Sequence, residues 1–199
     1  MTWDEAQPLI NSIDGFLGAQ EGEWLFRQVQ AIPDSAVVVE IGSLRGRSTA
    51  CLALGCKGTQ KRVIAIDPFV DCRYDLAGAQ SYFDVWRGNM ERIGVIDRIE
   101  SLVMDSRQAG ALWGQRQTPI HLLFVDGSHL RDDVIADFED FFPWVVEGGV
   151  VAFHDILNNF VGPQEAWERC SGLLINVGMC DSMMFGQKPA TNYEGKNGH

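Results

Sequence analysis

The stretch from Val37 to Thr49, which reads Val-Val-Val-Glu-Ile-Gly-Ser-Leu-Arg-Gly-Arg-Ser-Thr, constrains the fold of this chain more than any other. Three β-branched residues predict a buried strand, and a loop with two glycines then leads into a helix. Glycine lets the backbone approach a ligand closely, and the first turn of a helix offers unpaired N–H groups. This order is typical of an α/β domain that binds a nucleotide-like ligand at the carboxyl edge of its sheet.

Glu40, at the end of this strand, narrows the class of ligand. A carboxylate would repel a pyrophosphate, so Glu40 favours a ligand that carries positive charge or hydroxyl groups. The spacing of Gly42 and Gly46 also departs from the G-x-G-x-x-G pattern of dinucleotide sites. S-adenosylmethionine fits, because it has an ammonium, a sulfonium and a ribose but no phosphate. The alternative is a structural strand-to-helix turn that binds nothing.

Composition excludes several classes of protein. The chain has 199 residues, 46% of them hydrophobic, which suits one globular domain. A net charge of −11 opposes binding to nucleic acid or to an anionic membrane surface. The acidic N-terminus lacks the order of a signal peptide, and no apolar run of about 18 residues is present. Five cysteines without zinc-type spacing indicate free thiols, so we expect a cytoplasmic protein.

Short apolar runs predict the strands of the sheet. The first five lie at Val37–Ile41, Arg62–Ile66, Ile99–Val103, His121–Val125 and Val150–Phe153. Runs of this kind are typical of parallel strands covered on both faces. Helices are expected between them, most clearly at Gln20–Ala31 and at Asp132–Val145, after which Gly148-Gly149 turns the chain into the next strand.

The last two strands are expected at Leu173–Val177 and Met183–Phe185, and the link between them is too short for a crossover helix, which makes them antiparallel neighbours. The pattern predicts an α/β, Rossmann-like three-layer sandwich with seven strands, mostly parallel. We divide the chain into an N-terminal helical cap at 1–34, a main domain at 35–187 and a flexible tail at 188–199.

Two acidic positions follow the second and third strands. Asp67 lies 21 residues after Gly46, close to the spacing at which an acid accepts ribose hydroxyls, although an Asp before Pro68 can also cap a helix. Asp105 and Ser106 can reach an adenine amine and ring nitrogen, or can cap the next helix.

The fourth and fifth strands carry the candidates for catalysis. Asp126 ends one of them and His154-Asp155 the other, so that these three side chains are expected to converge at one edge of the sheet. Two carboxylates suit Mg²⁺, while the imidazole leaves Mn²⁺, Fe²⁺ or Zn²⁺ open. His129 follows Asp126 by three residues, and an imidazole is the side chain that most often serves as a general base. The alternative is that the acids cap helices and the histidines bond to backbone.

Together these motifs resemble the class I S-adenosylmethionine-dependent methyltransferases. The similarity runs from about Gly15 to Phe185 and is greatest to the branch with the cephalosporin-hydroxylase-like proteins and the metal-dependent macrolide-sugar O-methyltransferases. The motifs that carry it are Glu40–Thr49, Ile66-Asp67-Pro68, Asp105-Ser106, Asp126-Gly127-Ser128-His129, Gly148-Gly149 and Phe153-His154-Asp155.

The resemblance implies a seven-stranded sheet with an antiparallel last strand, and a role for each motif. It places the methionine part of the cofactor on the loop that begins at Gly42, the ribose on Asp67 and the adenine on Asp105-Ser106. The cofactor residues that we predict are Glu40, Gly42, Ser43, Gly46, Ser48, Asp67, Asp105, Ser106 and Asp126.

The resemblance also implies a metal held by Asp126, His154 and Asp155, with His129 and Asp126 as catalytic residues. His154 departs from the pattern, because the sugar O-methyltransferases carry a second acid there. Replacing a carboxylate by imidazole lowers Mg²⁺ affinity and favours a softer ion, so Mg, Mn and Fe all stay open.

The expected function is therefore transfer of a methyl group from S-adenosylmethionine to a hydroxyl of a small molecule or sugar, with or without a divalent metal. A homodimer is compatible with a domain of this size. Two alternatives remain: a metal-dependent hydroxylase-like tailoring enzyme that uses two histidines and one carboxylate, and a non-catalytic protein that binds S-adenosylmethionine as a structural ligand.

Overall fold

The computed structural model describes residues 1–70 and 81–190. Cys72 lies outside the described residues, as does most of the tail predicted at 188–199. In the described part, no helix is both long and apolar enough to cross a membrane.

Seven strands and seven α-helices are described, and they alternate through most of the chain. The strands are β1 (Val37–Ile41), β2 (Arg62–Ile66), β3 (Ile99–Leu102), β4 (Ile120–Val125), β5 (Val145–Phe153), β6 (Ile175–Cys180) and β7 (Met183–Gln187). The helices are α1 (Trp3–Asn11), α2 (Ala19–Ala31), α3 (Arg47–Gly55), α4 (Tyr82–Arg92), α5 (Ser106–Arg116), α6 (Arg131–Phe141) and α7 (Val161–Cys170).

The strands form one sheet in the order β3-β2-β1-β4-β5-β7-β6. The first five are parallel, and β7 pairs antiparallel with both β5 and β6. The Rossmann-like fold and the closing hairpin predicted from the sequence are therefore confirmed. The order reverses between β1 and β4, which is the point in such a sheet where ligands bind.

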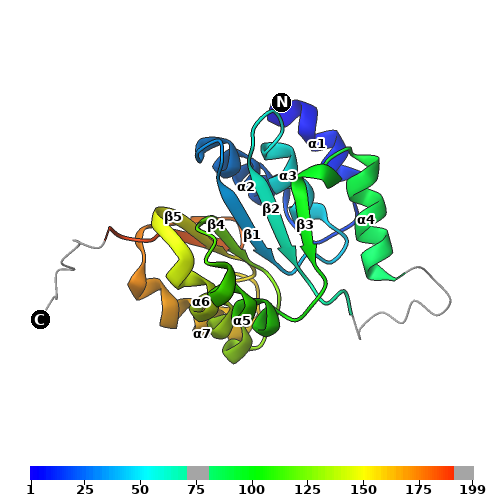
Figure 1. The fold of residues 1–199 in the computed structure, drawn as a ribbon. Helices are drawn as coiled ribbons and strands as arrows, with labels where there is room; N and C mark the ends of the chain where they lie inside the picture. The colour runs from blue at the N-terminus through cyan, green and yellow to red at the C-terminus, as the bar shows by residue number, and fades with distance from the viewer. Residues whose placement is uncertain (71–80, 191–199) are drawn as a thin grey trace, which may run out of the picture.

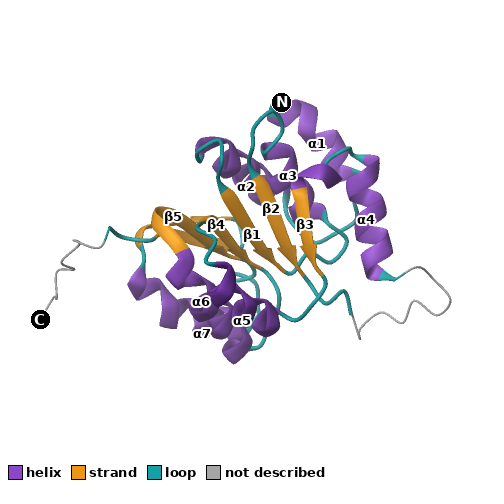
Figure 2. Cartoon of the chain, viewed as in Figure 1, coloured by secondary structure: helices purple, strands orange, loops and turns teal. Residues whose placement is uncertain are grey.

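Helices cover the sheet on both faces (Figures 1 and 2). Alternate strand residues point to opposite sides, so Val38 and Phe124 join the core with α1–α4, whereas Val39 and Val125 join the core with α5–α7. Side chains of the predicted N-terminal cap, such as Trp3 and Leu25, belong to the first core. Helices α1 and α2 therefore share a hydrophobic core with this face of the sheet.

The structure corrects the predicted boundary between α6 and β5. The sequence predicted a helix over Asp132–Val145 and a strand from Val150, but α6 ends at Phe141 and a 3₁₀ turn over Phe142–Trp144 leads directly into β5. Pro143 has no N–H to continue an α-helix, and Val145 is buried opposite Ile120 in the sheet. Apolar spacing alone cannot separate these two ways of burying Val145.

Two further boundaries differ from those predicted. Gly148 and Gly149 lie inside β5, where Gly148 has φ 74°, so they do not precede the strand. Lys188, which we assigned to the tail, still pairs with this part of the sheet: Lys188 N donates to Gly149 O, and Gly148 N donates to Lys188 O.

Candidate active site

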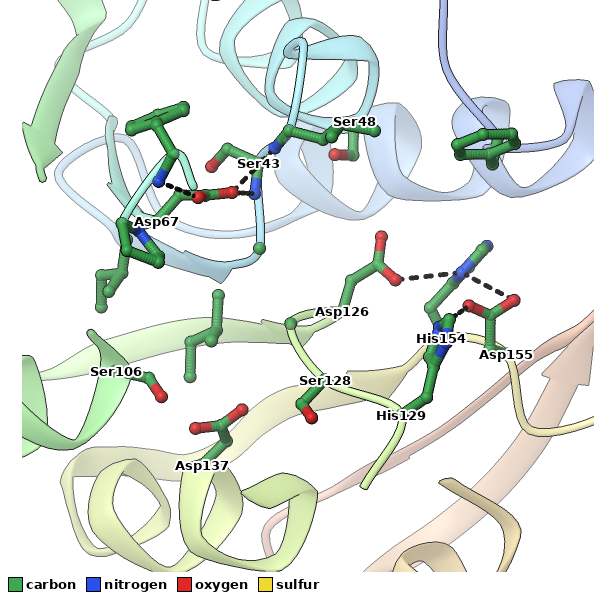
Figure 3. Close-up of a pocket in the computed structure, with 18 of the residues that line it drawn as sticks. Ser43, Ser48, Asp67, Ser106, Asp126, Ser128, His129, Asp137, His154 and Asp155 are labelled. Atoms are coloured by element: carbon green, nitrogen blue, oxygen red, sulfur yellow. Dashed lines mark hydrogen bonds and ion pairs between the residues drawn. The ribbon is translucent and has the colours of Figure 1, made fainter. Parts of the chain in front are cut away.

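A cavity of about 1150 Å³ opens at the carboxyl edge of the parallel strands. The segments after β1, β2, β3, β4 and β5 all contribute to its lining, together with residues 14–17 between α1 and α2. Figure 3 shows Ser43, Ser48 and Asp67 on one side, and the two histidines with Asp126 and Asp155 on another.

Gly42 lets the loop after β1 lie against the end of β4. It has φ 88°, and a Cβ at this position would lie 2.2 Å from the carbonyl oxygen of Asp126. Its N–H donates to Ile66 O at 2.9 Å, while Asp126 N donates to Ile41 O at 2.8 Å. A side chain here would therefore displace the loop and Asp126 together.

The side-chain carboxylate of Asp67 holds the backbone of the same loop. Its Oδ2 accepts from Ser43 N at 2.7 Å and from Leu44 N at 2.8 Å, and its Oδ1 accepts from Phe69 N at 2.5 Å. A carboxylate oxygen can accept two hydrogen bonds, so Oδ1 retains capacity for one donor from a ligand in the cavity. Asp67 therefore fits the predicted ribose contact, through Oδ1.

Glu40 and Gly46 differ from the other predicted cofactor residues, because neither lines the cavity that the described residues form. Glu40 is fully buried, and its Oε2 accepts from Ser43 Oγ at 2.7 Å and Thr49 Oγ1 at 2.5 Å. Gly46 has φ 94° and faces Met90 and Trp86. Both residues support the loop from the side away from the cavity, and a direct cofactor contact by either of them stays a prediction.

Burial raises the pKa of Glu40 to about 7, although hydroxyl groups of Ser48, Thr49 and Ser43 partly oppose the shift. Glu40 is therefore partly uncharged near neutral pH, so its charge selects the ligand less strongly than the sequence suggests. Its carboxyl group accepts hydrogen bonds from Ser43 in the loop and from Thr49 in the first turn of α3.

Ser106 and Asp105 both line the cavity after β3. Asp105 also caps α5, because its Oδ1 accepts from Arg107 N at 2.8 Å. The cap and a ligand contact are compatible, since a carboxylate has further lone pairs.

Asp137 is a cavity residue that sequence reasoning missed. It lies on α6 and is 2% exposed, Ser106 is its hydrogen-bonding neighbour, and its Oδ1 has no partner among the described residues. Burial raises its pKa to about 7. A signal was available, because Asp137 follows Val134 by three residues and so lies on the apolar face of the predicted helix.

The register of β4 and β5 brings Asp126 and His154 side by side. Val125 is opposite Phe153, and His154 N continues the pairing by donating to Val125 O at 3.0 Å. His154 Nδ1 lies 3.1 Å from Asp126 Oδ1 and 3.4 Å from Asp155 Oδ1. The three side chains converge as the strand ends predicted (Figure 3).

His129 and Asp155 form a second pair in the same place. His129 Nε2 lies 2.9 Å from Asp155 Oδ2, and its ring stacks on Phe160 with the centroids 3.8 Å apart. Asp155 has φ 61°, an uncommon backbone conformation for a residue with a side chain. This backbone conformation is part of what sets the carboxylate between the two imidazoles.

The charges in this cluster shift one another's pKa values. Burial raises the pKa of Asp126 and would also raise that of Asp155, but hydrogen bonds from His129 and His154 outweigh it and lower the pKa of Asp155. For His154, burial favours the neutral ring, yet the carboxylates around it prevail and raise its pKa.

Comparison with known families identifies the fold. Residues 39–156 match a family model described as a methyltransferase domain. The matched residues make up more than half of the chain. The chain belongs to this family. The matched region begins within β1 and ends just beyond Asp155, so it contains the loop after β1 and the cluster at the ends of β4 and β5.

Solved structures support the same fold. CalS11, a TDP-rhamnose 3'-O-methyltransferase of calicheamicin biosynthesis, is 22% identical with a TM-score of 0.63, over 83% of this chain and 76% of that one. An O-methyltransferase from Bacillus cereus, in complex with SAH, is 19% identical with a TM-score of 0.65, over 94% and 90%. TomG from Streptomyces achromogenes, in complex with SAM, is 15% identical with a TM-score of 0.67, over 94% and 89%.

The donor atoms of this methyltransferase domain fit a divalent cation. One ligand atom each from Asp126, His154 and Asp155 lies within 4.8 Å of the other two. His154 Nδ1 is buried at ion-pair distance from both acids, yet it has no hydrogen-bond partner in the described part of the chain. Bonds of about 2.1 Å to one ion would set neighbouring donors about 3 Å apart, as Asp126 Oδ1 and His154 Nδ1 are.

The hydroxylase alternative needs two histidines and one carboxylate around a metal. Among the described residues, the group that can hold an ion contains one histidine and two carboxylates. The Nε2 of His129 is already paired with Asp155. The geometry therefore does not favour this alternative.

Proposed function

We propose that this methyltransferase transfers the methyl group of S-adenosylmethionine to a hydroxyl group of a small molecule or sugar. The observation that carries the proposal is the juxtaposition, in one cavity, of the Gly42 loop held by Asp67 with a general-base candidate beside two carboxylates. O-methyltransferases among the structural neighbours, one of them acting on TDP-rhamnose, support the same reaction class.

The cofactor would lie along the edge of the sheet. The loop of Gly42, Ser43 and Ser48 would take its methionine part, Asp67 Oδ1 a ribose hydroxyl, and Asp105 and Ser106 its adenine. Asp137 would add a further acceptor or donor at the adenine end, since its carboxyl group neighbours Ser106 and its Oδ1 has no partner among the described residues. S-adenosylmethionine supplies an activated methyl group when bound.

His129 is proposed to remove the proton of the acceptor hydroxyl. Because the pKa of Asp155 is lowered, its carboxylate is ionised and takes a hydrogen bond from Nε2 of His129. Nε2 then carries the hydrogen, so Nδ1 is the nitrogen able to accept a proton. The acceptor oxygen would take the methyl group that bound S-adenosylmethionine supplies, S-adenosylhomocysteine would leave, and His129 would hold the proton of the acceptor. Much of the rate enhancement would come from alignment.

Asp126, His154 and Asp155 would hold a divalent cation. Such a cation, when bound, lowers the pKa of an acceptor hydroxyl and so eases its deprotonation. The nitrogen donor of this site, His154 Nδ1, favours Mn²⁺ or Fe²⁺ over Mg²⁺. We also propose that the protein is cytoplasmic and forms a homodimer. Analytical ultracentrifugation would test the dimer.

The test uses S-adenosylmethionine with an isotopically labelled methyl group and a panel of hydroxylated small molecules and sugars. Each reaction is run with Mn²⁺, with Mg²⁺ and with a chelator. We expect a labelled methyl ether together with S-adenosylhomocysteine, and loss of both in His129→Ala. If the protein binds no S-adenosylmethionine at about 1 mM, a weak affinity by any standard, the proposal fails.

A further inference from the structure

Glu21 is a buried carboxylate that no motif predicted. It lies in the first turn of α2, 133 residues from His154 in sequence, and is only 2% exposed. Its Oε1 accepts from Ser182 N at 3.0 Å and Ser182 Oγ at 2.6 Å. Its Oε2 accepts from Gly18 N at 2.8 Å and lies 3.1 Å from His154 Nε2.

Helix capping explains only one of these four contacts. The bond from Gly18 N closes the start of α2, and a capping glutamate needs no burial to make it. The other contacts join α2 to the β6–β7 turn through Ser182 and to the end of β5 through His154. Burying a carboxylate costs free energy of desolvation. A buried carboxylate that is bonded to three separate segments therefore indicates a role beyond capping the helix.

The contact with His154 sets the orientation of its ring. With Nε2 donating to Glu21, Nδ1 is directed toward Asp126 and Asp155 and has no hydrogen-bond partner among the described residues. Histidines that bind metals commonly donate their other ring N–H to a carboxylate, which fixes the tautomer and makes the ligand more basic.

We propose that Glu21 is a positioning residue that holds His154 with Nδ1 facing a metal shared with Asp126 and Asp155. The N-terminal helical region thus contributes to the site from outside the matched 39–156 region. The inference rests on the metal-assisted form of the proposed function. The competing interpretation is that His154 serves as an internal cation among three carboxylates, with no metal bound.

The test measures metal binding by the full-length protein without cofactor. Co²⁺ is titrated while its visible absorption is followed, and Mn²⁺ binding is measured in parallel by electron paramagnetic resonance. Glu21→Gln keeps the shape of the side chain but removes its charge. We expect Glu21→Gln to weaken binding of both ions about 10- to 100-fold and to alter the Co²⁺ spectrum.

Glu23→Gln is the matched control. Glu23 lies two residues further along α2, and its described partner is the exposed Arg27. We expect its metal affinity to equal that of the wild type. Ser182→Ala removes one donor to Glu21 but leaves the carboxylate in place, so we expect metal affinity to fall only a few fold. This variant replaces Glu21→Gln in the test if Glu21→Gln does not fold.

Two results would overturn the inference. Equal metal affinity in Glu21→Gln and wild type would leave Glu21 with a structural role alone, as a helix cap and as a link to the β6–β7 turn. Absence of Co²⁺ and Mn²⁺ binding by wild type at about 1 mM would favour His154 as an internal cation. Titration of S-adenosylmethionine into the same samples separates either result from failure of the proposed function, because cofactor binding should persist in all variants.

Discussion

The loop after β1 is held mainly through backbone N–H groups, whereas the cluster of Asp126, His154 and Asp155 is held by side chains from distant segments. Asp67 accepts from two successive N–H groups of the loop, only 24 and 23 residues away in sequence. His154 instead contacts Glu21, 133 residues away. The cofactor part of the cavity is thus a local motif, and the reaction part depends on how several elements pack.

This difference implies that the two parts can be damaged separately. A change in the loop should affect cofactor binding and folding, since the loop joins β1 to β4 through Gly42. A change at Asp155 in the cluster should affect the reaction and leave cofactor binding nearly intact. Four substitutions test this separation, from the largest expected effect to the smallest.

Gly42→Ala should have the largest effect. The new Cβ would overlap the backbone of Asp126 at 2.2 Å, in a backbone conformation that disfavours alanine. We expect a loss of about 3 kcal/mol or more in stability and no measurable binding of S-adenosylmethionine. Thermal unfolding and calorimetry give the two values. Gly88→Ala is the control, because nothing lies within 4 Å of its added Cβ and it should unfold no earlier than wild type.

Asp155→Asn should come next and should affect turnover alone. It removes the charge that orients His129 and one proposed metal ligand, so turnover should fall about 100- to 10,000-fold. The affinity for S-adenosylmethionine should stay within about twofold of wild type by calorimetry. An equal loss in affinity and turnover would show that the two parts are not separable.

Asp67→Asn should weaken cofactor binding about tenfold and leave the fold intact. An amide can accept from Ser43 N and Leu44 N through its oxygen, but its NH₂ group cannot accept from Phe69 N or from a ribose hydroxyl. Calorimetry measures the affinity, and circular dichroism checks the fold. Unchanged affinity would remove Asp67 from the ribose site.

Asp137→Asn should change the pH dependence of stability. Burial raises the pKa of Asp137 from 3.8 to about 7, so the folded protein binds a proton that the unfolded chain releases. Stability from this group is therefore present at low pH and is lost as the pH rises from about 4 to about 7. Urea unfolding at pH 5 and pH 8 should show a smaller difference in the variant, by on the order of a few kcal/mol. An equal difference in both proteins would contradict the assignment.

The sequence was sufficient for features set by short stretches of chain. The bounds of β1 and β2 follow from apolar runs between turn residues, and the convergence of Asp126 with His154 follows from their places at neighbouring strand ends. The methyltransferase family was identified from the same motifs and is confirmed.

Other features depend on tertiary packing and were missed for that reason. Glu21 matters because α2 packs near the β6–β7 turn, which no local pattern encodes. Glu40 stands at the end of a strand, where the sequence predicts a ligand contact, yet its side chain points away from the cavity and accepts from Thr49. The positive φ of Asp155 cannot be read from an aspartate at a strand end.

The most direct test of the account is calorimetric titration of S-adenosylmethionine into wild type, Gly42→Ala and Asp155→Asn under one set of conditions. We expect equal binding by wild type and Asp155→Asn, and no binding by Gly42→Ala. Absence of binding by wild type at about 1 mM would contradict it, because a cofactor that does not bind there cannot donate its methyl group.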